Sequence, residues 1–323
     1  MSDTRRERTG YVPDVPITVS PMFEWPPRPL ALARYLITPV LLPYGLVFVL
    51  AALAAWRWAT PSLDTMSEFG VGWIALVWLR NAALLTLVAG GLHWWLYIRR
   101  AQEQEYKYNA RWMSTTNRSF LWTNQTRDNI FWSVVSGVTI WTAYEVVGHW
   151  LAATGRSPVR GWDDAPVLLA AQMVLVFVWS TLHFYLNHRL LHWGPLYDAA
   201  HSLHHKNVNT GPWSGIAMHP IEHVLYFSGA ALFWVIPSHP TVAMCFLFFS
   251  GFSPPISHSG FDEVRTGVGR APAGDYFHHL HHRYFECNYG NRLVPLDKIF
   301  GTFHDGTAEA HQQMRERRVA AGR

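Results

Sequence analysis

The sequence is poor in charged residues and in cysteine, and both shortages reduce the number of protein classes that fit it. Asp, Glu, Lys and Arg together make up 15% of its 323 residues, well below the roughly 25% of a typical soluble domain. Its two cysteines, Cys245 and Cys287, are too few for a disulfide scaffold and form no CxxC pair, so we expect two free thiols. The net charge of +4 comes without a dense Lys/Arg block, which argues against nucleic acid as a partner.

Long apolar runs take the place of the missing charges. A helix of about 20 residues covers about 30 Å, the thickness of the hydrocarbon core of a bilayer. Four runs are long enough to be considered, at residues 36–56, 82–98, 130–153 and 167–187. The third run contains Glu145 and His149, but the other three carry no Asp, Glu, Lys or Arg. The sequence therefore predicts about four membrane-spanning helices.

Two later apolar stretches, residues 224–236 and 241–256, are shorter and are separated by Pro-Ser-His-Pro at residues 237–240. Neither is long enough to span a bilayer comfortably on its own, so we expect a re-entrant apolar hairpin over residues 224–256. The expected fold class is all-α: a polytopic membrane helix bundle of about four spans plus this hairpin, with a cytosolic, helical, His-rich cap that binds metal.

The distribution of Lys and Arg gives an expected orientation. Eleven of these residues lie in segments 1–35 and 99–127, against four in the segments on the opposite side of the bundle. By the positive-inside rule, the N-terminus and everything after the fourth span face the cytoplasm in this interpretation. The protein is then a multi-pass integral membrane protein with its His-rich motifs on the cytoplasmic side.

Histidine is the residue type in excess, with 18 copies, 14 of them between residues 183 and 282. The motifs are HxxxH at His188 and His192, HxxHH at His201, His204 and His205, a single His258 before Ser-Gly, and HxxHH at His278, His281 and His282. Spacings of three and four place side chains on one face of a helix. Burying so many imidazoles without a metal would leave polar nitrogens unsatisfied, so the motifs predict a polynuclear metal site.

Isolated histidines have a simpler interpretation. We expect His93, His149, His239 and His311 to be structural, hydrogen-bonded side chains, because a lone His in an apolar run is usually of that kind. His183 precedes the first motif by five residues and is a weaker candidate ligand. Imidazole suits zinc, iron, copper and nickel alike, so the ligand type alone does not choose the metal.

Taken in order, the motifs resemble the fatty acid hydroxylase/sterol desaturase superfamily of membrane di-iron, histidine-box enzymes. The resemblance covers residues 185–302 and rests on these segments: YLNHRLLH, HSLHH, AMHPIE at 217–222, HSG from 258, HHLHHRYFECNYG from 278, and LDKIFGT at 296–302. A fainter similarity to the sterol C5-desaturase branch covers residues 125–145. The chain departs from the family pattern at Thr181, Phe277 and Leu296, and none of these positions is a core ligand.

The resemblance implies the site residues. The metal ligands and catalytic residues would be His188, His192, His201, His204, His205, His258, His278, His281 and His282. Candidates for a further ligand, or for a group that orients one, are His219, Glu222, His223, Asp262, Asp275 and His279. Among these, a polar contact is the alternative for His223, a helix cap for Asp275 and a solvated turn for Asp262. No substrate-binding residue is assigned, although Trp213, Tyr226, Phe227 and Trp234 are candidates for a channel wall.

The resemblance also implies the activity and the cofactors. The expected protein is an O2-dependent, non-haem di-iron oxidoreductase that hydroxylates or desaturates a C–H bond of a sterol-like or fatty-acyl lipid. It would bind two iron ions, and zinc in purified protein would not argue against iron because zinc occupies iron sites. No Rossmann fingerprint or iron–sulfur Cys set is present, so an external electron donor of ferredoxin or cytochrome type is expected. The basic loop 99–127 is a candidate dock for it, with attraction to lipid headgroups as the alternative.

Other functions stay open at this point. A hydroxylase of a polar lipid headgroup or acyl chain has the same motifs. A non-oxidative metal protein such as a transporter would thread ionisable residues through several spans. A zinc hydrolase needs about three protein ligands, far fewer than nine. The expected organisation is a disordered cytosolic N-terminus (1–35), an N-terminal transmembrane region (36–165), a catalytic domain (166–305) and a polar C-terminal tail (306–323).

Overall fold

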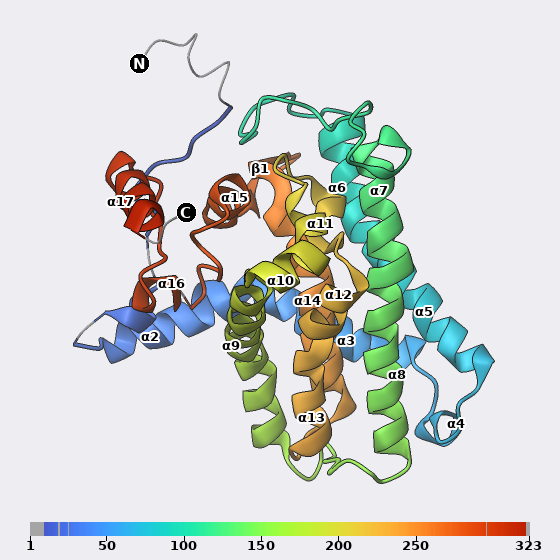
Figure 1. The fold of residues 1–323 in the computed structure, drawn as a ribbon. Coiled ribbons are helices and arrows are strands. Elements are labelled where there is room, and N and C mark those ends of the chain that lie inside the picture. The colour runs from blue at the N-terminus through green and yellow to red at the C-terminus, as the bar shows by residue number, and fades with distance from the viewer. Residues whose placement is uncertain (1–9, 19, 25, 295, 321–323) are drawn as a thin grey trace.

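The computed structural model describes residues 10–320 apart from 19, 25 and 295. It is a helical bundle that carries a compact cap at one end (Figure 1). Five helical segments are long and apolar enough to cross a membrane: Pro29–Ala59, Val71–Ile98, Gln125–Ala153, Pro166–Leu191 and Pro240–Ser257. The first four confirm the four predicted spans.

Several of these spans change helix type along their length. The first span comprises α2 (Pro29–Tyr35), η2 (Leu36–Gly45) and α3 (Leu46–Ala59). The second span comprises α5 (Val71–Leu85), η3 (Thr86–Gly90), α6 (Gly91–His93) and η4 (Trp94–Ile98). The third span comprises α7 (Gln125–Phe131), η6 (Trp132–Val138) and α8 (Thr139–Ala153). The fourth is the single helix α9 (Pro166–Leu191), and the fifth is α14 (Pro240–Ser257).

The first span is kinked within η2, and the sequence explains where. Thr38 and Leu42 have extended backbone angles inside the otherwise helical segment. Each of them precedes a proline, Pro39 or Pro43, and the ring of a proline pushes the preceding residue out of the helical region. The span therefore bends where the two prolines lie.

The expected hairpin over residues 224–256 goes deeper than a half-inserted segment. Its descending arm is α12 (Pro220–Phe227), η9 (Ser228–Ala231) and α13 (Leu232–Val235), and α14 returns to the cap. The turn between the arms pairs with the α8–α9 connection: the Arg160 amide donates to the Ser238 carbonyl at 2.9 Å, and the Ser238 amide donates to the Pro158 carbonyl at 3.3 Å. The hairpin thus reaches the end of the bundle opposite the cap (Figure 1).

Helix α14 is the centre of the hydrophobic core. It packs against α3, α8 and α9, and its Phe246 and Phe248 are fully buried together with Trp141 of α8. A helix that is apolar on all sides requires such a central position, since each face needs a partner. The core therefore holds the returning arm of the hairpin in the middle of the bundle.

A closed polar network lies between α5 and α8. The Arg80 guanidinium forms an ion pair with the Glu145 carboxylate and also donates to Asn81 Oδ1 at 3.0 Å and to Thr60 Oγ1 at 3.0 Å. The Asn81 amide donates to Glu145 Oε2 at 3.0 Å, and His149 Nε2 lies 3.2 Å from Glu145 Oε1. We call Arg80, Asn81, Glu145 and His149 the span network. Its charges neutralise each other, as buried ionisable groups within spans require.

The cap is built from short elements that follow α9 and α14. They are α10 (Gly194–Leu196), η7 (Tyr197–His201), α11 (Ser202–His205), η8 (Pro212–Ile216), β1 (His258–Thr266), β2 (Gly269–Gly274), α15 (Tyr276–Tyr284), α16 (Leu296–Ile299) and α17 (Ala308–Ala320). The strands β1 and β2 form an antiparallel hairpin, a small exception to the expected all-α class. The remaining elements are η1 (Pro21–Phe23), α4 (Leu63–Met66) and η5 (Leu121–Thr123).

The described part of the N-terminal segment differs from the expected disorder, and the polar C-terminal tail is partly helical. The Tyr11 amide donates to the Lys107 carbonyl at 2.7 Å and the Ile17 amide to the Asp305 carbonyl at 2.8 Å, so the N-terminal segment lies against the cap. Helix α2 begins at Pro29, within the segment expected to be disordered. The expected polar tail contains α17, whose Met314 is buried. Residues 1–9 lie outside the described part of the chain.

Candidate metal centre

Four parts of the fold bring the His motifs together. His188 lies in the last turn of α9 and His192 caps it. The second motif is on η7 and α11, His258 is the residue where α14 passes into β1, and the third motif is on α15. The first two motifs and His258 lie at element ends, and α15 is a short helix, so all of the motifs can point into the same space within the cap.

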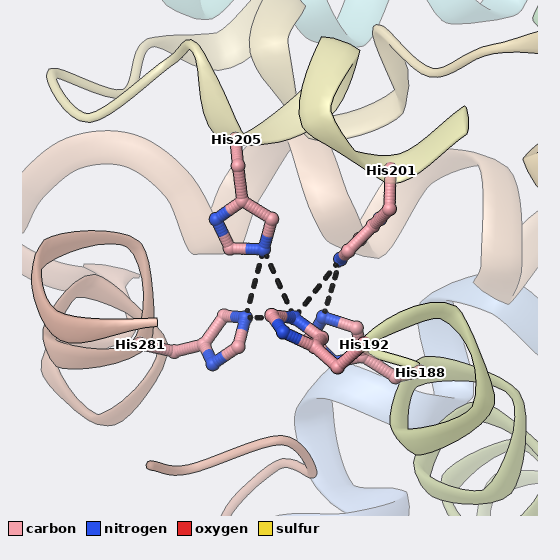
Figure 2. Close-up of side chains that lie close together, drawn as sticks. All are labelled: His188, His192, His201, His205 and His281. Carbon is pink, nitrogen blue, oxygen red and sulfur yellow. Dashed lines mark hydrogen bonds between the residues drawn. The ribbon is translucent and has the colours of Figure 1, made fainter. Parts of the chain in front are cut away.

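The structure sorts the nine predicted ligands into two sets. The first set is His188, His192, His201, His205 and His281, and the second set is His204, His258, His278 and His282. Within each set the candidate ligand atoms lie within 4.8 Å of one another. In the first set, neighbouring Nε2 atoms are 3.1–3.2 Å apart (Figure 2). In the second set, the Nε2 atoms of His258, His278 and His282 show the same spacing, 3.1–3.2 Å.

In three of the imidazoles, a hydrogen bond at Nδ1 determines which ring nitrogen carries the proton. His188 Nδ1 donates to the Tyr289 carbonyl at 2.5 Å, His281 Nδ1 to the Cys287 carbonyl at 2.7 Å, and His258 Nδ1 to the Pro254 carbonyl at 3.0 Å. A carbonyl only accepts, so these Nδ1 atoms hold the proton and the Nε2 atoms carry a lone pair. The Nε2 lone pairs of His188 and His281 are therefore available to the first set, and that of His258 to the second.

This arrangement fits a metal ion in each set. Imidazole nitrogens bind a metal such as zinc at about 2.0–2.1 Å, so two adjacent ligands at octahedral or tetrahedral angles lie about 2.8–3.4 Å apart. The observed nitrogen–nitrogen spacing falls in this range. Lone pairs at that separation repel each other unless a cation lies between them. Both His sets can hold a metal ion.

The buried environment keeps the imidazoles in the form that binds metal. Burial lowers the pKa of His201 to about 3 and that of His204 to about 4. For His205, His281 and His282, burial and then the neighbouring imidazoles lower the pKa well below the ordinary value. A metal needs the neutral imidazole, so at neutral pH no proton competes with it.

Glu222 contacts the first set from outside. Its Oε1 lies 2.8 Å from His201 Nδ1, the contact expected of a carboxylate that orients a ligand imidazole. Burial raises the pKa of Glu222 to about 8. Positive charge nearby would favour its ionised form, and metal ions in the two His sets would provide such charge.

A second supporting carboxylate was not recognised in the sequence. Asp297 accepts from the amides of Tyr289 and Gly290 at 2.9 and 2.7 Å and from Thr302 Oγ1 at 2.5 Å. It thereby holds the loop whose carbonyls accept from His188 and His281. Asn288 fixes the same loop by donating to the carbonyls of Phe277 and His304 at 3.0 and 2.9 Å. The signal was present in the motif LDKIFGT, in which Asp297 is the one acidic residue.

Five other predicted site residues lie outside both sets. His219 and Asp275 are helix N-caps, of α12 and α15. His223 hydrogen-bonds to Ser136 Oγ at 2.8 Å and the Ile216 carbonyl at 3.0 Å, and Asp262 accepts from the Tyr108 hydroxyl at 2.6 Å. The His279 ring stacks on Tyr108. The helix cap was the alternative for Asp275 and the polar contact the alternative for His223.

The histidines expected to be structural also lie away from the sets. His149 belongs to the span network, and His239 caps α14 by accepting from the Thr241 amide at 3.2 Å. His93 stacks on Tyr97, and the His311 ring lies 4.8 Å from that of Tyr284 at a tilted angle. His183, the weaker candidate ligand, is paired with Ser228 Oγ at 2.9 Å and with the Asn187 amide at 2.8 Å.

A cavity of about 720 Å³ adjoins the His sets, within the range of about 300–1,000 Å³ typical of ligand sites. It touches the two sets through His188, His201, His204, His258 and His278, and its apolar walls include Phe184, Tyr226, Phe249, Tyr44 and Val47. Val47 is 61% exposed on α3, so the cavity reaches the outer surface of the bundle. Of the four aromatic residues considered as channel walls, Tyr226 lines this cavity, whereas Trp213 and Phe227 pack in the core and Trp234 lies in a small space beside Glu145.

Comparison with known proteins agrees with the geometry. The model of the family described as fatty acid hydroxylase matches residues 173–302, which include all nine ligand candidates. A Delta(7)-sterol 5(6)-desaturase of Gibberella zeae is 31% identical over 193 residues, or 54% of this chain and 55% of that protein. A putative methylsterol monooxygenase of Dictyostelium discoideum is 30% identical over 176 residues, or 54% of this chain and 64% of that protein.

A methylsterol monooxygenase of Gallus gallus is 29% identical over 168 residues, or 49% of this chain and 56% of that protein. The chain thus spans between about half and two thirds of the length of these curated relatives. No solved structure matches it. The segment that the family model matches, residues 173–302, is the part of the chain that carries the His sets.

Proposed function

We propose that this integral membrane protein, whose residues 173–302 belong to the fatty acid hydroxylase family, uses two iron ions and O2 to hydroxylate or desaturate a C–H bond of a membrane lipid. Relatives named as sterol desaturases and methylsterol monooxygenases favour a sterol-like lipid as the first substrate to test, with fatty-acyl lipids as the second. The catalytic unit would be residues 166–305, carried by the preceding spans.

One observation supports this function above all others: a large apolar-walled cavity ends at both His sets. Five of the nine imidazoles line it, so a lipid in the cavity would lie directly against two adjacent metal sites. Hydrolytic zinc sites use about three protein ligands and an open position, whereas here five and four imidazoles converge. Two closely spaced metals next to an apolar cavity suit the oxidation of a hydrocarbon.

The chain's own residues would prepare the site for this chemistry. His188, His192, His201, His205 and His281 would hold one iron, and His204, His258, His278 and His282 the other. Iron held in this way supplies the activation of O2 and the oxidising power that an unreactive C–H bond needs. The carbonyls of Tyr289, Cys287 and Pro254 fix the tautomers of His188, His281 and His258 in advance, so these three ligands need no change of tautomer when metal binds.

The cavity walls would position the substrate and exclude water. The Phe184 ring lies 4.8 Å from the His188 ring and 6.2 Å from the His278 ring, at the junction between the cavity and both sets. The Tyr226 hydroxyl donates to the Ser250 carbonyl at 2.9 Å, which leaves its ring as an apolar wall. Such packing holds one C–H bond near the metals while it keeps water out.

The substrate would enter from the bilayer. The cavity reaches the lipid-facing surface at Val47, in the span kinked by Pro39 and Pro43. The surplus of Lys and Arg in segments 1–35 and 99–127 supports a cytoplasmic N-terminus and a cytoplasmic site. Electrons would come from a separate donor on that side.

Comparative lipid mass spectrometry would test this function. Cells that make the intact chain are compared with cells that make His204→Ala, in hosts supplied with sterols, varied polar lipids and a competent electron donor. We expect a lipid that gains one oxygen, or loses two hydrogens, only with the intact chain. His93→Ala serves as the matched control because His93 lies outside both sets, and it should keep the product. Identical lipids with and without the intact chain would contradict the proposal.

A further inference from the structure

One face of α9 lines the cavity over about three helical turns. The lining residues of α9 are Ser180, His183, Phe184, Asn187, His188 and Leu191, and spacings of three and four belong to a single helix face. Because α9 runs up to the cap (Figure 1), the position of a residue on this face measures its distance from the metal centre. Ser180 precedes the ligand candidate His188 by eight residues, which is about 12 Å along the helix axis. Ser180 therefore borders a part of the cavity that is remote from the His sets.

The hydroxyl of Ser180 is buried and unpaired. Ser180 is 6% exposed, and its Oγ has no hydrogen-bond partner among the described residues. The hydroxyl of the next residue, Thr181, donates to the Phe177 carbonyl at 3.0 Å, as hydroxyl groups within helices can do. A buried hydroxyl without a partner costs free energy. The unpaired Oγ beside the cavity therefore points to a ligand that carries a polar group.

Two other polar sites on the cavity wall are accounted for by contacts within the protein. Glu222 Oε2 is also buried and unpaired, but Glu222 Oε1 contacts His201 at 2.8 Å, so this carboxylate belongs to the metal centre. The Arg292 guanidinium lies 3.1 Å from the Asp275 carboxylate, and the charges of this pair offset each other. Among the described residues, Ser180 Oγ is therefore the unpaired buried group that borders the cavity away from the metal centre.

The wall around Ser180 is apolar and lies close to the opening of the cavity. The Phe177 ring, one turn before Ser180, lies 5.1 Å from that of Phe249, which lines the cavity. The first span approaches closely here, because a Cβ at Gly45 would lie 2.9 Å from the Phe177 ring. Val47, where the cavity reaches the outer surface, follows two residues later. A lipid hydroxyl in these surroundings would find few partners other than Ser180.

A second hydroxyl occupies a comparable position on α14. Ser250 lines the cavity and is 5% exposed. It precedes the ligand candidate His258 by eight residues, just as Ser180 precedes His188. Helices α9 and α14 pack against each other. Two walls of the cavity thus carry a serine about 12 Å along the helix from a ligand candidate.

We infer that Ser180 binds the hydroxyl group of a hydroxylated lipid, a sterol or a long-chain alcohol, and presents to the His sets a carbon about 12 Å from that hydroxyl. This inference rests on the proposed function, because it orients the substrate of that reaction. A lipid that enters at Val47 reaches the His sets with its apolar end first and leaves its hydroxyl beside Ser180. A hydroxyl both donates and accepts, so each of the two hydroxyls gains a partner in an otherwise apolar space.

The test measures the preference of the cavity for a hydroxyl. Purified, metal-loaded protein in detergent is offered equal amounts of a hydroxylated lipid and its hydrocarbon counterpart, either cholesterol with cholest-5-ene or 1-octadecanol with octadecane. Gas chromatography–mass spectrometry gives the ratio of the two lipids that the protein retains. We expect Ser180→Ala to lower this ratio about three- to tenfold, the contribution of one neutral hydrogen bond, because only the hydroxylated lipid loses a contact. The pair that responds distinguishes a sterol from a straight-chain alcohol.

Thr181→Val is the matched control. It also removes one hydroxyl from α9, at the neighbouring position, and Thr181 does not line the cavity. The retention ratio of this variant should equal that of the unaltered protein. Partitioning of the lipids into detergent is the same for every variant and cancels in the comparison. Metal content should be unchanged in both variants, because neither residue belongs to a His set.

The position of the oxidised carbon provides a second measurement. In the product of the unaltered chain, the new oxygen or double bond should be remote from the lipid hydroxyl, and Ser180→Ala should spread it over several carbons. If the unaltered chain oxidises no lipid, the proposed function fails, while the retention ratio still tests Ser180.

Three results would overturn the inference. The first is the same retention ratio for the unaltered protein and Ser180→Ala with both lipid pairs, because the hydroxyl would then serve only its own helix. The second is an equal fall of the ratio in Thr181→Val. The third is a product oxidised at a carbon next to the lipid hydroxyl.

Discussion

The span network and the metal centre both bury polar side chains, but they differ in how those groups are satisfied. In the span network, Arg80 and Glu145 neutralise each other, and Asn81 and His149 complete the hydrogen bonds of the carboxylate. In the metal centre, the Nδ1 atoms of His188, His258 and His281 donate to backbone carbonyls, and the Nε2 atoms of each His set face one another. The span network is satisfied by its own residues, whereas the metal centre requires a cation.

This difference distinguishes a structural polar cluster from a functional one without reference to any related protein. A buried polar group is tolerated when a partner within the protein satisfies it. Where several acceptors converge without a donor, the missing partner is a ligand. Ionisable residues within spans often mark transport pathways, but the span network closes on itself and therefore does not by itself favour a transporter.

The largest expected effect distinguishes a ligand imidazole from a network imidazole. His258→Ala should abolish lipid oxidation and remove about half of the bound metal, because one of the two His sets loses a ligand. His149→Ala should leave metal content unchanged, since His149 lies outside both sets. Metal analysis of the purified variants, together with lipid mass spectrometry, checks both. Equal metal loss in the two variants would remove the distinction.

The next largest effect concerns the ion pair. Arg80→Met should lower the free energy of unfolding by about 3–5 kcal/mol, because it leaves the Glu145 carboxylate buried without its partner. The double variant Arg80→Met/Glu145→Leu should recover most of that loss, since no charge is left unpaired. Unfolding of the metal-loaded protein in detergent measures both. A double variant as unstable as the single one would show that the network has a role beyond neutralising its own charges.

A smaller effect is expected from the carboxylate behind the first set. Glu222→Gln keeps the size of the side chain but removes its charge, and it should weaken metal binding about 10- to 100-fold, as loss of a group that orients a ligand commonly does. Competition with a chelator of known affinity measures this loss. His219→Ala is the control, because His219 caps α12 and lies outside both sets; a similar loss there would mean that the effect is general loosening of the cap.

The smallest effect is a change in pH dependence at the other end of the bundle. Burial lowers the pKa of His239 to about 4, and its neutral ring accepts from the Thr241 amide. Between pH 4 and the ordinary pKa near 6.5, the unfolded chain binds more protons, so stability falls as the pH is lowered through this range. His239→Asn keeps a cap acceptor that does not titrate, and it should flatten the curve of melting temperature against pH. An unchanged curve would assign the acid sensitivity to other groups.

Much of the molecule was predictable from local patterns. The four long apolar runs gave the first four spans, because the length of an uninterrupted apolar segment is a property of the sequence itself. The pre-proline positions Thr38 and Leu42 mark the kink of the first span for the same reason. The depth of the hairpin was not predictable, since it depends on the pairing of Ser238 with Pro158 and Arg160, residues far away in the chain.

The spacing of the histidines determined which side chains converge, but only the tertiary structure decided how they divide. His204 and His205 are neighbours in the chain yet belong to different sets, and so do His281 and His282. Successive residues of a helix point about 100° apart, so which of them faces which partner depends on how α9, α11, α14 and α15 are packed. The supporting role of Asp297 was hidden for the same reason, because it acts through a loop carbonyl. The helical spacing of side chains is a property of the sequence itself, whereas which helices contact one another depends on the core packed between them.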